Sequence, residues 1–505
     1  MKSRPVFPSR ALFDRARKSG LGISFVLARP CRQSARALFE PLARTSRRPL
    51  LLESSRTGSE TGRFSFMLWD PFAVFQSKGL RWSYRFASTT GRGRVGQGPV
   101  SGTGDPLTAL RRIARTRRTA PGNPLPFSGG PAGLFTYELK DRFEKLRFKV
   151  RDPWKLPDID LGFYDRGLAL DHAKGELCAF RAFSSAELKR RTYAECVEET
   201  RRVYDALEAF KASQQGASAS KSGGLPRRLG SSDAARRRFM RAVVRIREHI
   251  RKGDVYQVNL SQVIELAFVG DAYGLYLRQA QMNPTSFAAY ADFGDYRLVS
   301  ASPERLVRVD GTHVSTRPIA GTRPRSRDPR KDRDLTAELL LSPKERAEHV
   351  MLVDLERNDL GRVCRPGSVR VDELMAVEKY SHVKHIVSNV TGELKADADA
   401  WDVIRAVFPG GTITGAPKIR AMEIIAKLEG RVRGPYTGSL GYVGFDGNCD
   451  LNIVIRTLWT RGRKAWLQAG AGIVADSDPR KEYEETLHKA AAFLDCLGLG
   501  RSKAH

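Results

Sequence analysis

From about residue 20 to residue 210 the chain mixes short apolar runs with glycine-rich turns. The runs at residues 49–54, 63–66 and 133–137 predict strands. Residues 186–211 instead predict an amphipathic helix, because their large apolar side chains recur at helical spacing. Those side chains are Tyr193, Val197, Val203, Tyr204, Leu207 and Phe210.

A helical pattern opens the second half of the chain. Ser232 or Asp233 can cap a helix that runs to residue 250. One face of this helix is apolar and consists of Phe239, Val243, Ile246 and Ile250. Gly253 and Asp254 end the helix, residues 255–261 predict a strand, and helices alternate with strands from there to the end. This mixture predicts an α+β or mixed α/β fold.

These patterns divide the chain into five parts. They are a basic N-terminal arm (1–20), a strand-rich region (21–211), a Ser/Gly-rich linker (212–232), a second region that carries the candidate chemistry (233–495) and a C-terminal tail (496–505). The arm is basic because the first 50 residues hold 12 Lys and Arg but only two acids, Asp14 and Glu40. Its composition resembles a transit peptide weakly, but no apolar segment with a cleavage site follows.

The composition narrows the classes of protein. The 505 residues carry a formal net charge of +30, which suits a nucleic-acid binder or an enzyme for anionic metabolites. The basic residues are spread along the chain without a zinc-finger or leucine-zipper pattern, so we do not expect nucleic-acid binding as the main role. The six cysteines show no C-x-x-C spacing, and no run of about 18 apolar residues predicts a membrane span. A cytoplasmic protein is the default expectation.

Two pairs of glutamates are candidates for a metal site. Glu345 and Glu348 share one face of a helix that Ser342 and Pro343 begin, and Glu482 and Glu485 do the same after Pro479. Two such pairs could surround one hard cation, for which oxygen-only ligands point to Mg²⁺. On spacing alone, however, solvated helix faces are the better interpretation.

Glycine segments and one arginine are further candidates. Residues 408–418 (FPGGTITGAPK) lead into a predicted helix at 419–428, and such a turn can hold an anion on its N–H groups, although it is not a Walker A loop. Residues 470–475 match a dinucleotide-binding loop only formally, because no helix follows at once. Arg456 follows an apolar segment, where either a substrate carboxylate or an internal salt bridge could be its partner. His382 and His385 predict buried structural side chains.

Taken together, long segments of the second half resemble the chorismate-utilising enzymes, which include anthranilate, aminodeoxychorismate, isochorismate and salicylate synthases. The matching segments occur in family order. They are 253–262 (GDVYQVNLSQ), 302–306 (SPERL), 318–323 (PIAGTR), 347–363 (AEHVMLVDLERNDLGRV), 385–388 (HIVS), 408–425 (FPGGTITGAPKIRAMEII), 455–457 (IRT) and 470–486 (GAGIVADSDPRKEYEET). The first half resembles the family more loosely, at 51–54 (LLES) and 129–144 (GGPAGLFTYELKDRFE). The resemblance implies an α+β sandwich of antiparallel sheets with outer helices and a central cleft.

The resemblance also implies a metal site and an acid. Glu348 and Glu485 would hold Mg²⁺, with Glu345 and Glu482 in support, and the cation would bind the ring carboxylate of chorismate. Glu304 would protonate the departing 4-hydroxyl group.

Further residues would bind and orient the substrate. Arg456, Tyr436 and the backbone around Gly472 would hold the enolpyruvyl carboxylate. His385 and Thr412 would position the ring, and Lys418 and Gly411 would lie near that site. On this interpretation His385 is functional, whereas His382 stays structural.

Two positions bear on the nucleophile. Gln257 stands where isochorismate and salicylate synthases carry a lysine that activates water, so the resemblance implies a member that uses ammonia. Ala320 stands where many aminodeoxychorismate synthases carry a lysine, and alanine is the anthranilate-type residue. Lys384, next to His385, could offer another amine, but a surface lysine is the better interpretation.

Other segments favour the aminodeoxychorismate type. They are 137–144, 256–260, 409–414 and 450–453, together with residues 283–287, which lack the Pro-Tyr-Met of tryptophan-regulated anthranilate synthases. The expected reaction is therefore Mg²⁺-dependent amination of chorismate to 4-amino-4-deoxychorismate, for folate biosynthesis. The alternative is anthranilate formation for tryptophan biosynthesis. No glutaminase signature is present, so ammonia is expected from a separate glutamine amidotransferase subunit or from solution.

Two alternatives belong to other classes. One is a non-catalytic regulatory protein that binds an aromatic amino acid through residues 51–54. The other is a nucleic-acid binder, which rests on the net charge alone.

Overall fold

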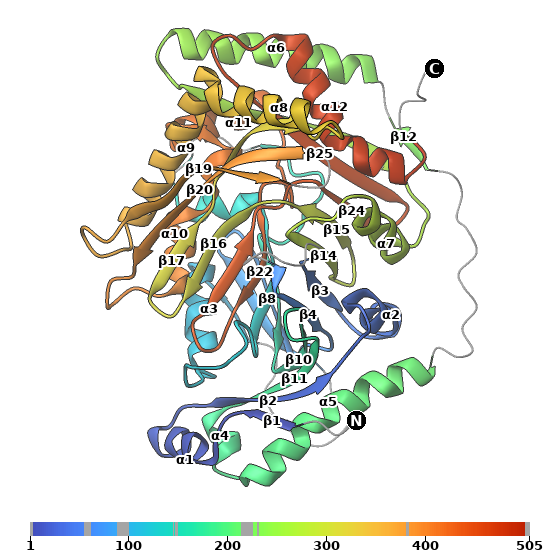
Figure 1. Ribbon diagram of the computed structural model, residues 1–505, viewed down its shortest axis with the longest axis vertical. Helices are drawn as coiled ribbons and strands as arrows, with labels where there is room; N and C mark the ends of the chain where they lie inside the picture. The colour runs from blue at the N-terminus through green and yellow to red at the C-terminus, as the bar shows by residue number, and fades with distance from the viewer. Residues whose placement is uncertain are drawn as a thin grey trace.

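The computed structural model describes residues 4–54, 62–87, 100–144, 146, 150–213, 226–229, 232–379 and 383–499. Two large antiparallel sheets run through the molecule, and helices cover their outer faces (Figure 1). The predicted α+β fold, with antiparallel sheets and outer helices, is therefore confirmed. None of the helices in the described part of the chain combines the length and the hydrophobicity of a membrane span.

Within the described residues the first sheet has 13 strands. Its first half comes from the N-terminal part of the chain, in the order β1 (Arg4–Phe7), β2 (Ile23–Pro30), β11 (Glu176–Phe183), β10 (Arg166–Asp171), β4 (Phe64–Leu68) and β3 (Leu50–Glu53). Its second half follows in the order β14 (Phe287–Asp292), β15 (Arg297–Ser302), β24 (Thr457–Arg461), β25 (Lys464–Ile473), β13 (Gln257–Ala267) and β12 (Arg227–Leu229), and β21 (Gly415–Ala416) also pairs with β13.

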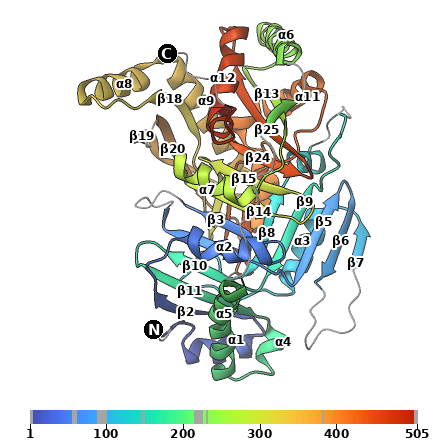
Figure 2. The ribbon, with the colours of Figure 1, turned by 90° about the vertical axis from the view of Figure 1, so that its right-hand side faces the viewer.

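The second sheet has 12 strands among the described residues. The C-terminal part of the chain supplies β18 (Ile319–Pro324), β20 (Val383–Glu393), β17 (His313–Thr316), β16 (Arg305–Asp310), β23 (Cys449–Asn452) and β22 (Ser439–Val443), with β19 (Arg370–Lys379) beside β20. The N-terminal part continues it with β8 (Gly130–Phe135), β9 (Ile159–Tyr164), β5 (Ala73–Lys78), β6 (Arg81–Phe86) and β7 (Val100–Thr103), whose outer edge is visible in Figure 2.

Each sheet therefore has a single seam between the two parts of the chain. In the first sheet β3 pairs with β14, with Leu51 opposite Tyr290. In the second sheet β8 pairs with β22, with Phe135 opposite Ser439. Because strands of the two parts are hydrogen-bonded to each other at both seams, each sheet is built jointly by the two parts of the chain.

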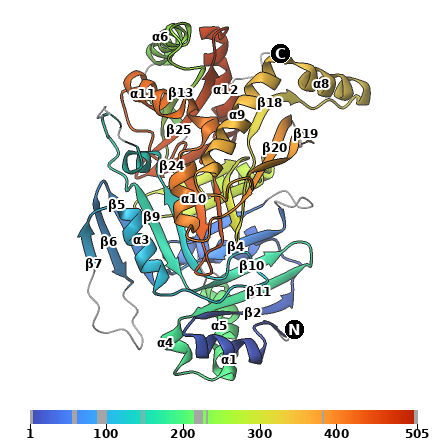
Figure 3. The same cartoon turned by 90° about the vertical axis from the view of Figure 1, so that its left-hand side faces the viewer.

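Helices gather at the two ends of the molecule. At one end lie α6 (Ser232–Arg251), α8 (Pro329–Leu341), α9 (Pro343–Gly361), α11 (Lys418–Glu429) and α12 (Pro479–Cys496), and Figure 3 shows α8 projecting from the body there. At the other end lie α1 (Arg10–Ser19), α4 (Ser185–Leu188) and α5 (Tyr193–Ser213). The remaining helices are α2 (Ala35–Thr45), α3 (Pro106–Arg115), α7 (Ala272–Met282) and α10 (Ala400–Val407), together with the 3₁₀ turns η2 (Tyr137–Arg142) and η3 (Gly411–Ile413).

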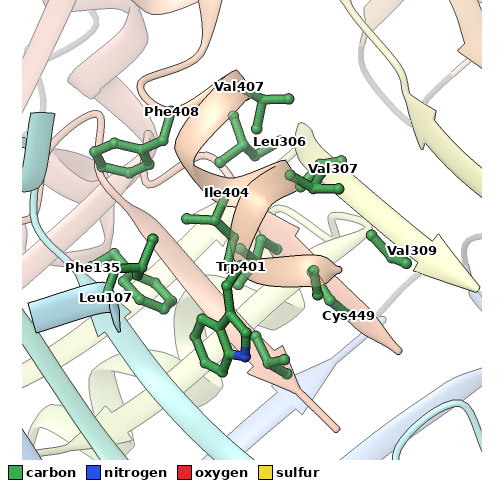
Figure 4. Close-up of a cluster of buried hydrophobic side chains, with 14 of the residues drawn as sticks. Leu107, Phe135, Leu306, Val307, Val309, Trp401, Ile404, Val407, Phe408 and Cys449 are labelled. Carbon is green, nitrogen blue, oxygen red and sulfur yellow. The ribbon is translucent and has the colours of Figure 1, made fainter. Parts of the chain in front are cut away.

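The core lies between and outside the sheets. A buried cluster that joins Phe66 and Leu68 of the first sheet to Leu134 and Tyr442 of the second packs the two sheets face to face. On the outer side of the second sheet, α10 inserts Trp401 and Ile404 between side chains such as Val307, Phe135 and Cys449 (Figure 4). Burial of these apolar side chains is the main force that holds the layers together.

The structure adds detail to several expected segments. Within the basic N-terminal arm, Arg4–Phe7 form β1 and Arg10–Ser19 form α1; β1 pairs with β2, and Phe13 of α1 is buried. The predicted helix at 186–211 is divided into α4 and α5. Of the expected linker at 212–232, residues 214–225 lie outside the described residues, whereas Arg227–Leu229 form β12 on the edge of β13.

Candidate functional site

A cavity of about 620 Å³ opens between α9, α12 and the ends of several strands. All but two of the site residues predicted from the sequence line this cavity. They are Gln257, Glu304, Glu345, Glu348, His385, Thr412, Tyr436, Arg456, Gly472, Glu482 and Glu485. Segments that are up to 228 positions apart in the chain therefore meet at one place, as residues 257 and 485 show.

The four glutamates come from two helices that face the cavity. Glu345 and Glu348 lie on α9, whose N-cap Ser342 accepts the N–H of Glu345, and Glu482 and Glu485 lie on α12. A donor set made only of carboxylate oxygens suits a hard divalent cation. Among the described residues, however, no group of three or more His, Cys, Asp or Glu side chains is close enough to hold a metal ion.

Cationic side chains pair with two of these carboxylates instead. Arg323 lies 3.1 Å from Glu345, and Lys489 lies 2.6 Å from Glu485. A divalent cation that bridged the two helices would have to compete with these pairs. The four carboxylates are therefore suitable ligands for such a cation. In this structure, however, Glu345 and Glu485 are each paired with a cationic side chain.

Glycines open the floor of the cavity on β25. A Cβ atom at Gly472 would lie 2.5 Å from Nε2 of Gln257 and 3.5 Å from Oε1 of Glu348. A Cβ at Gly470 would meet Asn259 and the Tyr436 hydroxyl at 2.5 and 2.6 Å. Both glycines lie inside the strand rather than in a phosphate-binding turn, and their missing side chains leave room for polar groups from neighbouring segments.

Gln257 stands on β13 beside the carboxylates. Its side-chain amide donates to Glu348 at 2.7 Å, and its own carbonyl Oε1 is buried without a hydrogen-bond partner in the described structure. An amide does not titrate near neutral pH, so Gln257 can orient groups but cannot remove a proton from water.

Glu304 is a buried acid on the short link between β15 and β16. Burial raises its pKa to about 7, although the Thr412 hydroxyl and the N–H of Ile319 oppose the rise. Oε1 of Glu304 has no hydrogen-bond partner among the described residues. A carboxyl group with a pKa near neutrality can hold a proton and release it to a leaving group.

His385 is held as a neutral imidazole. Burial lowers its pKa to about 4, against the opposing effect of the Gly321 carbonyl. Its Nδ1 lies 3.1 Å from that carbonyl and 2.9 Å from the Thr322 hydroxyl, which fixes the plane of the ring. The ring therefore lines the cavity as an oriented hydrogen-bonding group rather than as a cation.

Arg456 is half-buried and lines the cavity. Burial lowers its pKa, and among the described residues its side chain forms no ion pair and no hydrogen bond. The internal salt bridge considered from the sequence is therefore absent from the described structure. Its backbone adopts a left-handed φ of 48°, a strained conformation for a residue other than glycine. An anionic ligand is the natural partner of such a group.

Two predicted residues lie away from the cavity. Lys418 forms an ion pair with Asp359 at 2.5 Å and does not line the cavity. Gly411 lies against α9, where a Cβ would come within 2.5 Å of the Leu355 side chain. Both were predicted because they are close in sequence to Thr412, but both contact residues of α9 that do not line the cavity.

Other residues of the cavity were missed in the sequence. Lys489, Asn259 and Gln468 line it, and Lys489 also donates to the Gly470 carbonyl at 3.1 Å. Lys489 follows Glu485 by four positions, so one helical turn of α12 places both on the same face. This spacing could have predicted from the sequence that Lys489 lies beside Glu485 in the site.

Neither Lys384 nor the residue at position 320 places a lysine amine in the cavity. Lys384 is fully buried rather than on the surface, and it pairs with Asp332 at 3.0 Å and donates to the Thr336 hydroxyl at 2.8 Å. It thus ties α8 to β20 and does not line the cavity. Ala320 does line the cavity and offers no amine there. His382 lies outside the described residues.

A second, smaller cavity of about 90 Å³ lies at the seam of the first sheet. Leu52, Glu53 and Ser54 line it, as do Arg305 and Phe287. Glu53 is paired with Arg36 at 2.9 Å. The segment considered for binding an aromatic amino acid is therefore beside a cavity, which is distinct from the large one.

Comparisons with known proteins agree with this geometry. The family of chorismate binding enzymes matches residues 48–495. Aminodeoxychorismate synthase component 1 of Bacillus subtilis is 41% identical over 92% of this chain and 95% of its own length. Anthranilate synthase component 1 of Streptomyces coelicolor is 44% identical over 78% of each chain.

Solved structures of similar fold are also known. Anthranilate synthase component I of Streptococcus pneumoniae superposes with a TM-score of 0.71 and 31% identity, over 87% of this chain and 93% of that one. The menaquinone-specific isochorismate synthase of Escherichia coli, at 17% identity and a TM-score of 0.67 over 97% and 99% of the two chains, shares the fold. The match along most of the chain shows that this protein belongs to the family of chorismate binding enzymes.

Proposed function

We propose that this protein aminates chorismate with ammonia to give 4-amino-4-deoxychorismate, as the synthase component of a pair that includes a glutaminase. The observation that carries the proposal is the unpaired Arg456 guanidinium in a cavity that also holds a neutral amide, Gln257, and a buried acid, Glu304. The relative of this type from Bacillus subtilis matches almost the whole chain.

The cationic side of the cavity suits a dianionic substrate. Arg456 would bind the enolpyruvyl carboxylate through paired N–H donors, and Tyr436, from the neighbouring loop, would add its hydroxyl. Lys489, which lines the same cavity, would add positive charge once a cation takes over its partner Glu485. Because Arg456 is half-buried on the wall of the cavity, its attraction for a carboxylate is screened less by water than at an exposed surface.

The glutamates of α9 and α12 would hold Mg²⁺ against the ring carboxylate. When bound, the cation would draw charge from that carboxylate and so make the conjugated ring system more electrophilic. Glu348 and Glu485 are the proposed ligands, with Glu345 and Glu482 in support. Arg323 and Lys489 would give up their present partners to the cation.

Glu304 would supply the proton for the leaving hydroxyl. Hydroxide is a poor leaving group, so the C4–O bond breaks more easily when the oxygen departs as water. Nitrogen forms the new bond to C4, in place of the C4–O bond that breaks; the added ammonia loses a proton, and the Glu304 proton leaves with the hydroxyl group as water. His385 and Thr412 would hold the ring in the orientation that this exchange requires.

Gln257 supports ammonia rather than water as the nucleophile. A base that activates water must accept a proton, and an amide hydrogen-bonded to Glu348 does not. Ammonia needs no such activation because its lone pair is free at the moment of attack. The names of the relatives, which call them component 1, support a second component that supplies it.

A second candidate product is anthranilate. Ala320 favours it, because the wall at this position offers no lysine that could add covalently to the ring. Anthranilate synthases also stand among the relatives at similar identity. We favour the 4-amino product because the aminodeoxychorismate relative covers more of both chains.

A product assay separates the two candidates. Purified protein with chorismate, Mg²⁺ and ammonium is followed by chromatography, with and without added aminodeoxychorismate lyase. We expect 4-aminobenzoate only when the lyase is present. Fluorescent anthranilate in its absence would contradict the 4-amino product, and no turnover of chorismate would contradict both candidates.

A further inference from the structure

Arg433 lies behind the cavity, in the segment that follows α11 and leads to β22. Its side chain is only 1% exposed, and it does not line the cavity. A fully buried guanidinium is expensive to remove from water, so each of its N–H groups needs an acceptor.

All five donors of this guanidinium are used. Nε and Nη2 donate to the two oxygens of Glu429 at 3.0 and 2.7 Å, which makes a bidentate pair. The second N–H of Nη2 donates to the Asn259 carbonyl at 2.7 Å. Nη1 donates to the Ile413 carbonyl at 3.0 Å and to the Thr437 hydroxyl at 3.3 Å. A lysine, with three donors on one nitrogen, could not make this set.

The acceptors outside Glu429 belong to three separate walls of the cavity. Asn259 lies on β13 and itself lines the cavity. Ile413 follows Thr412, and both line the cavity. Thr437 follows Tyr436, whose ring centre lies 5.5 Å from the guanidinium carbon. One side chain thus joins the three segments that present Asn259, Thr412 and Tyr436.

Glu429 extends the network to a fourth wall. Its Oε1 also accepts the N–H and the hydroxyl of Ser261, at 2.9 and 2.7 Å. The Ser261 hydroxyl in turn accepts from Gln468, which lines the cavity, at 2.8 Å. Glu429 is the last residue of α11, so this helix supplies the carboxylate that holds both Arg433 and Ser261.

Glu138 fixes the backbone of the same segment from the N-terminal part of the chain. Its two oxygens accept the N–H groups of Arg433 and Gly434 at 2.8 and 3.0 Å. The Tyr137 N–H donates to the Gly434 carbonyl at 2.9 Å. Arg433 is therefore held on both its backbone and its side chain.

We propose that Arg433 is a positioning residue for the substrate site, because it fixes the walls that carry Asn259, Thr412 and Tyr436 relative to one another. This inference rests on the proposed function only in taking chorismate as the ligand. A displacement of the walls by about 1 Å is enough to lower a rate about 100-fold. A purely structural ion pair would instead change the stability of the fold and leave binding unaltered.

Three variants of the full chain test the proposal. Arg433→Lys keeps the charge but loses the fork, and Glu429→Gln keeps the shape but removes the negative charge. Arg117→Lys is the matched control: Arg117 is also buried, pairs with Glu187 at 2.9 Å, and does not line the cavity. The measurements are the unfolding temperature, the Kd for chorismate by calorimetry without ammonia, and kcat and KM with ammonium.

We expect Arg433→Lys and Glu429→Gln to weaken chorismate binding or lower kcat/KM by about tenfold or more at temperatures where the proteins are folded. Arg117→Lys should lower the unfolding temperature and leave both values within about twofold. Loss of stability in Arg433→Lys with unchanged Kd and kcat/KM would overturn the proposal.

If Arg433→Lys does not fold, the same measurements on Glu429→Gln test the proposal, and unchanged Kd and kcat/KM in that variant would overturn it. If the unaltered protein binds chorismate but forms no amine, the proposed reaction is wrong, and the Kd values still decide the role of Arg433.

Discussion

Glu304 combines burial with a position on the wall of the cavity, and this combination predicts its behaviour with pH. Its pKa is raised to about 7 by burial, so the group is protonated below neutral pH and loses its proton above it. If the protonated form donates to the leaving hydroxyl, kcat falls as the pH rises through about 7. Rates must be expressed per unprotonated ammonia, because its concentration rises with pH.

The Glu304→Gln variant tests this assignment. We expect kcat to fall by about 10²- to 10⁴-fold, with chorismate affinity nearly retained and the limb near pH 7 absent. The measurement is a pH–rate profile of both proteins from pH 5.5 to about 9. A variant with a near-normal rate and the same profile would remove Glu304 from the acid role.

Gly472 tests the importance of open space on the cavity floor. In Gly472→Ala the new Cβ would lie 2.5 Å from the Gln257 amide, which would have to move away from Glu348. We expect kcat/KM to fall by about tenfold or more. Gly361→Ala is the control, since a Cβ at Gly361 meets nothing within 4 Å. Equal activity of the two variants, measured under the same conditions, would contradict this account of the floor.

At the scale of elements, α9 and α12 both line the cavity and carry the candidate metal ligands. Glu348→Gln and Glu485→Gln should each remove most of the Mg²⁺-dependent activity and weaken Mg²⁺ binding measured by calorimetry. Glu484→Gln is a matched control on α12, because Glu484 pairs with Arg480 and does not line the cavity. Normal Mg²⁺ binding by either ligand variant would exclude that residue from the metal site.

The sequence allowed much of these elements to be predicted. The cap at Ser342 and the prolines at 343 and 479 correctly predicted where α9 and α12 begin. The i,i+3 spacing of the glutamates was correct, but spacing could not show that two helices whose first residues, Pro343 and Pro479, are 136 positions apart share a cavity. Only the resemblance to a family supplied that.

The errors arose where tertiary contacts decide. Lys418 was predicted near the substrate, but Asp359 on α9 is a buried partner that the local sequence does not reveal. Lys384 was expected on the surface because lysine usually lies there. It is buried because Asp332, 52 positions earlier, provides both a carboxylate and a carbonyl.

At the scale of the whole molecule, the two seams make the halves of the chain depend on each other. Without the N-terminal part, β14 and β22 would become open sheet edges, and unpaired edges of this kind favour aggregation. We expect residues 233–505 alone to be insoluble or unfolded by circular dichroism. Coexpression with residues 1–211 should restore a folded, active complex. A soluble, active C-terminal fragment would contradict the importance of the seams.

Isotope labelling identifies the nucleophile. Chorismate, Mg²⁺ and ¹⁵N-labelled ammonium are incubated with the protein in ¹⁸O-labelled water, and the product is examined by mass spectrometry. We expect a product that contains ¹⁵N, retains the enolpyruvyl group and has no new ¹⁸O. A product that carries ¹⁸O and no ¹⁵N would show that water is the nucleophile and that the protein does not aminate chorismate.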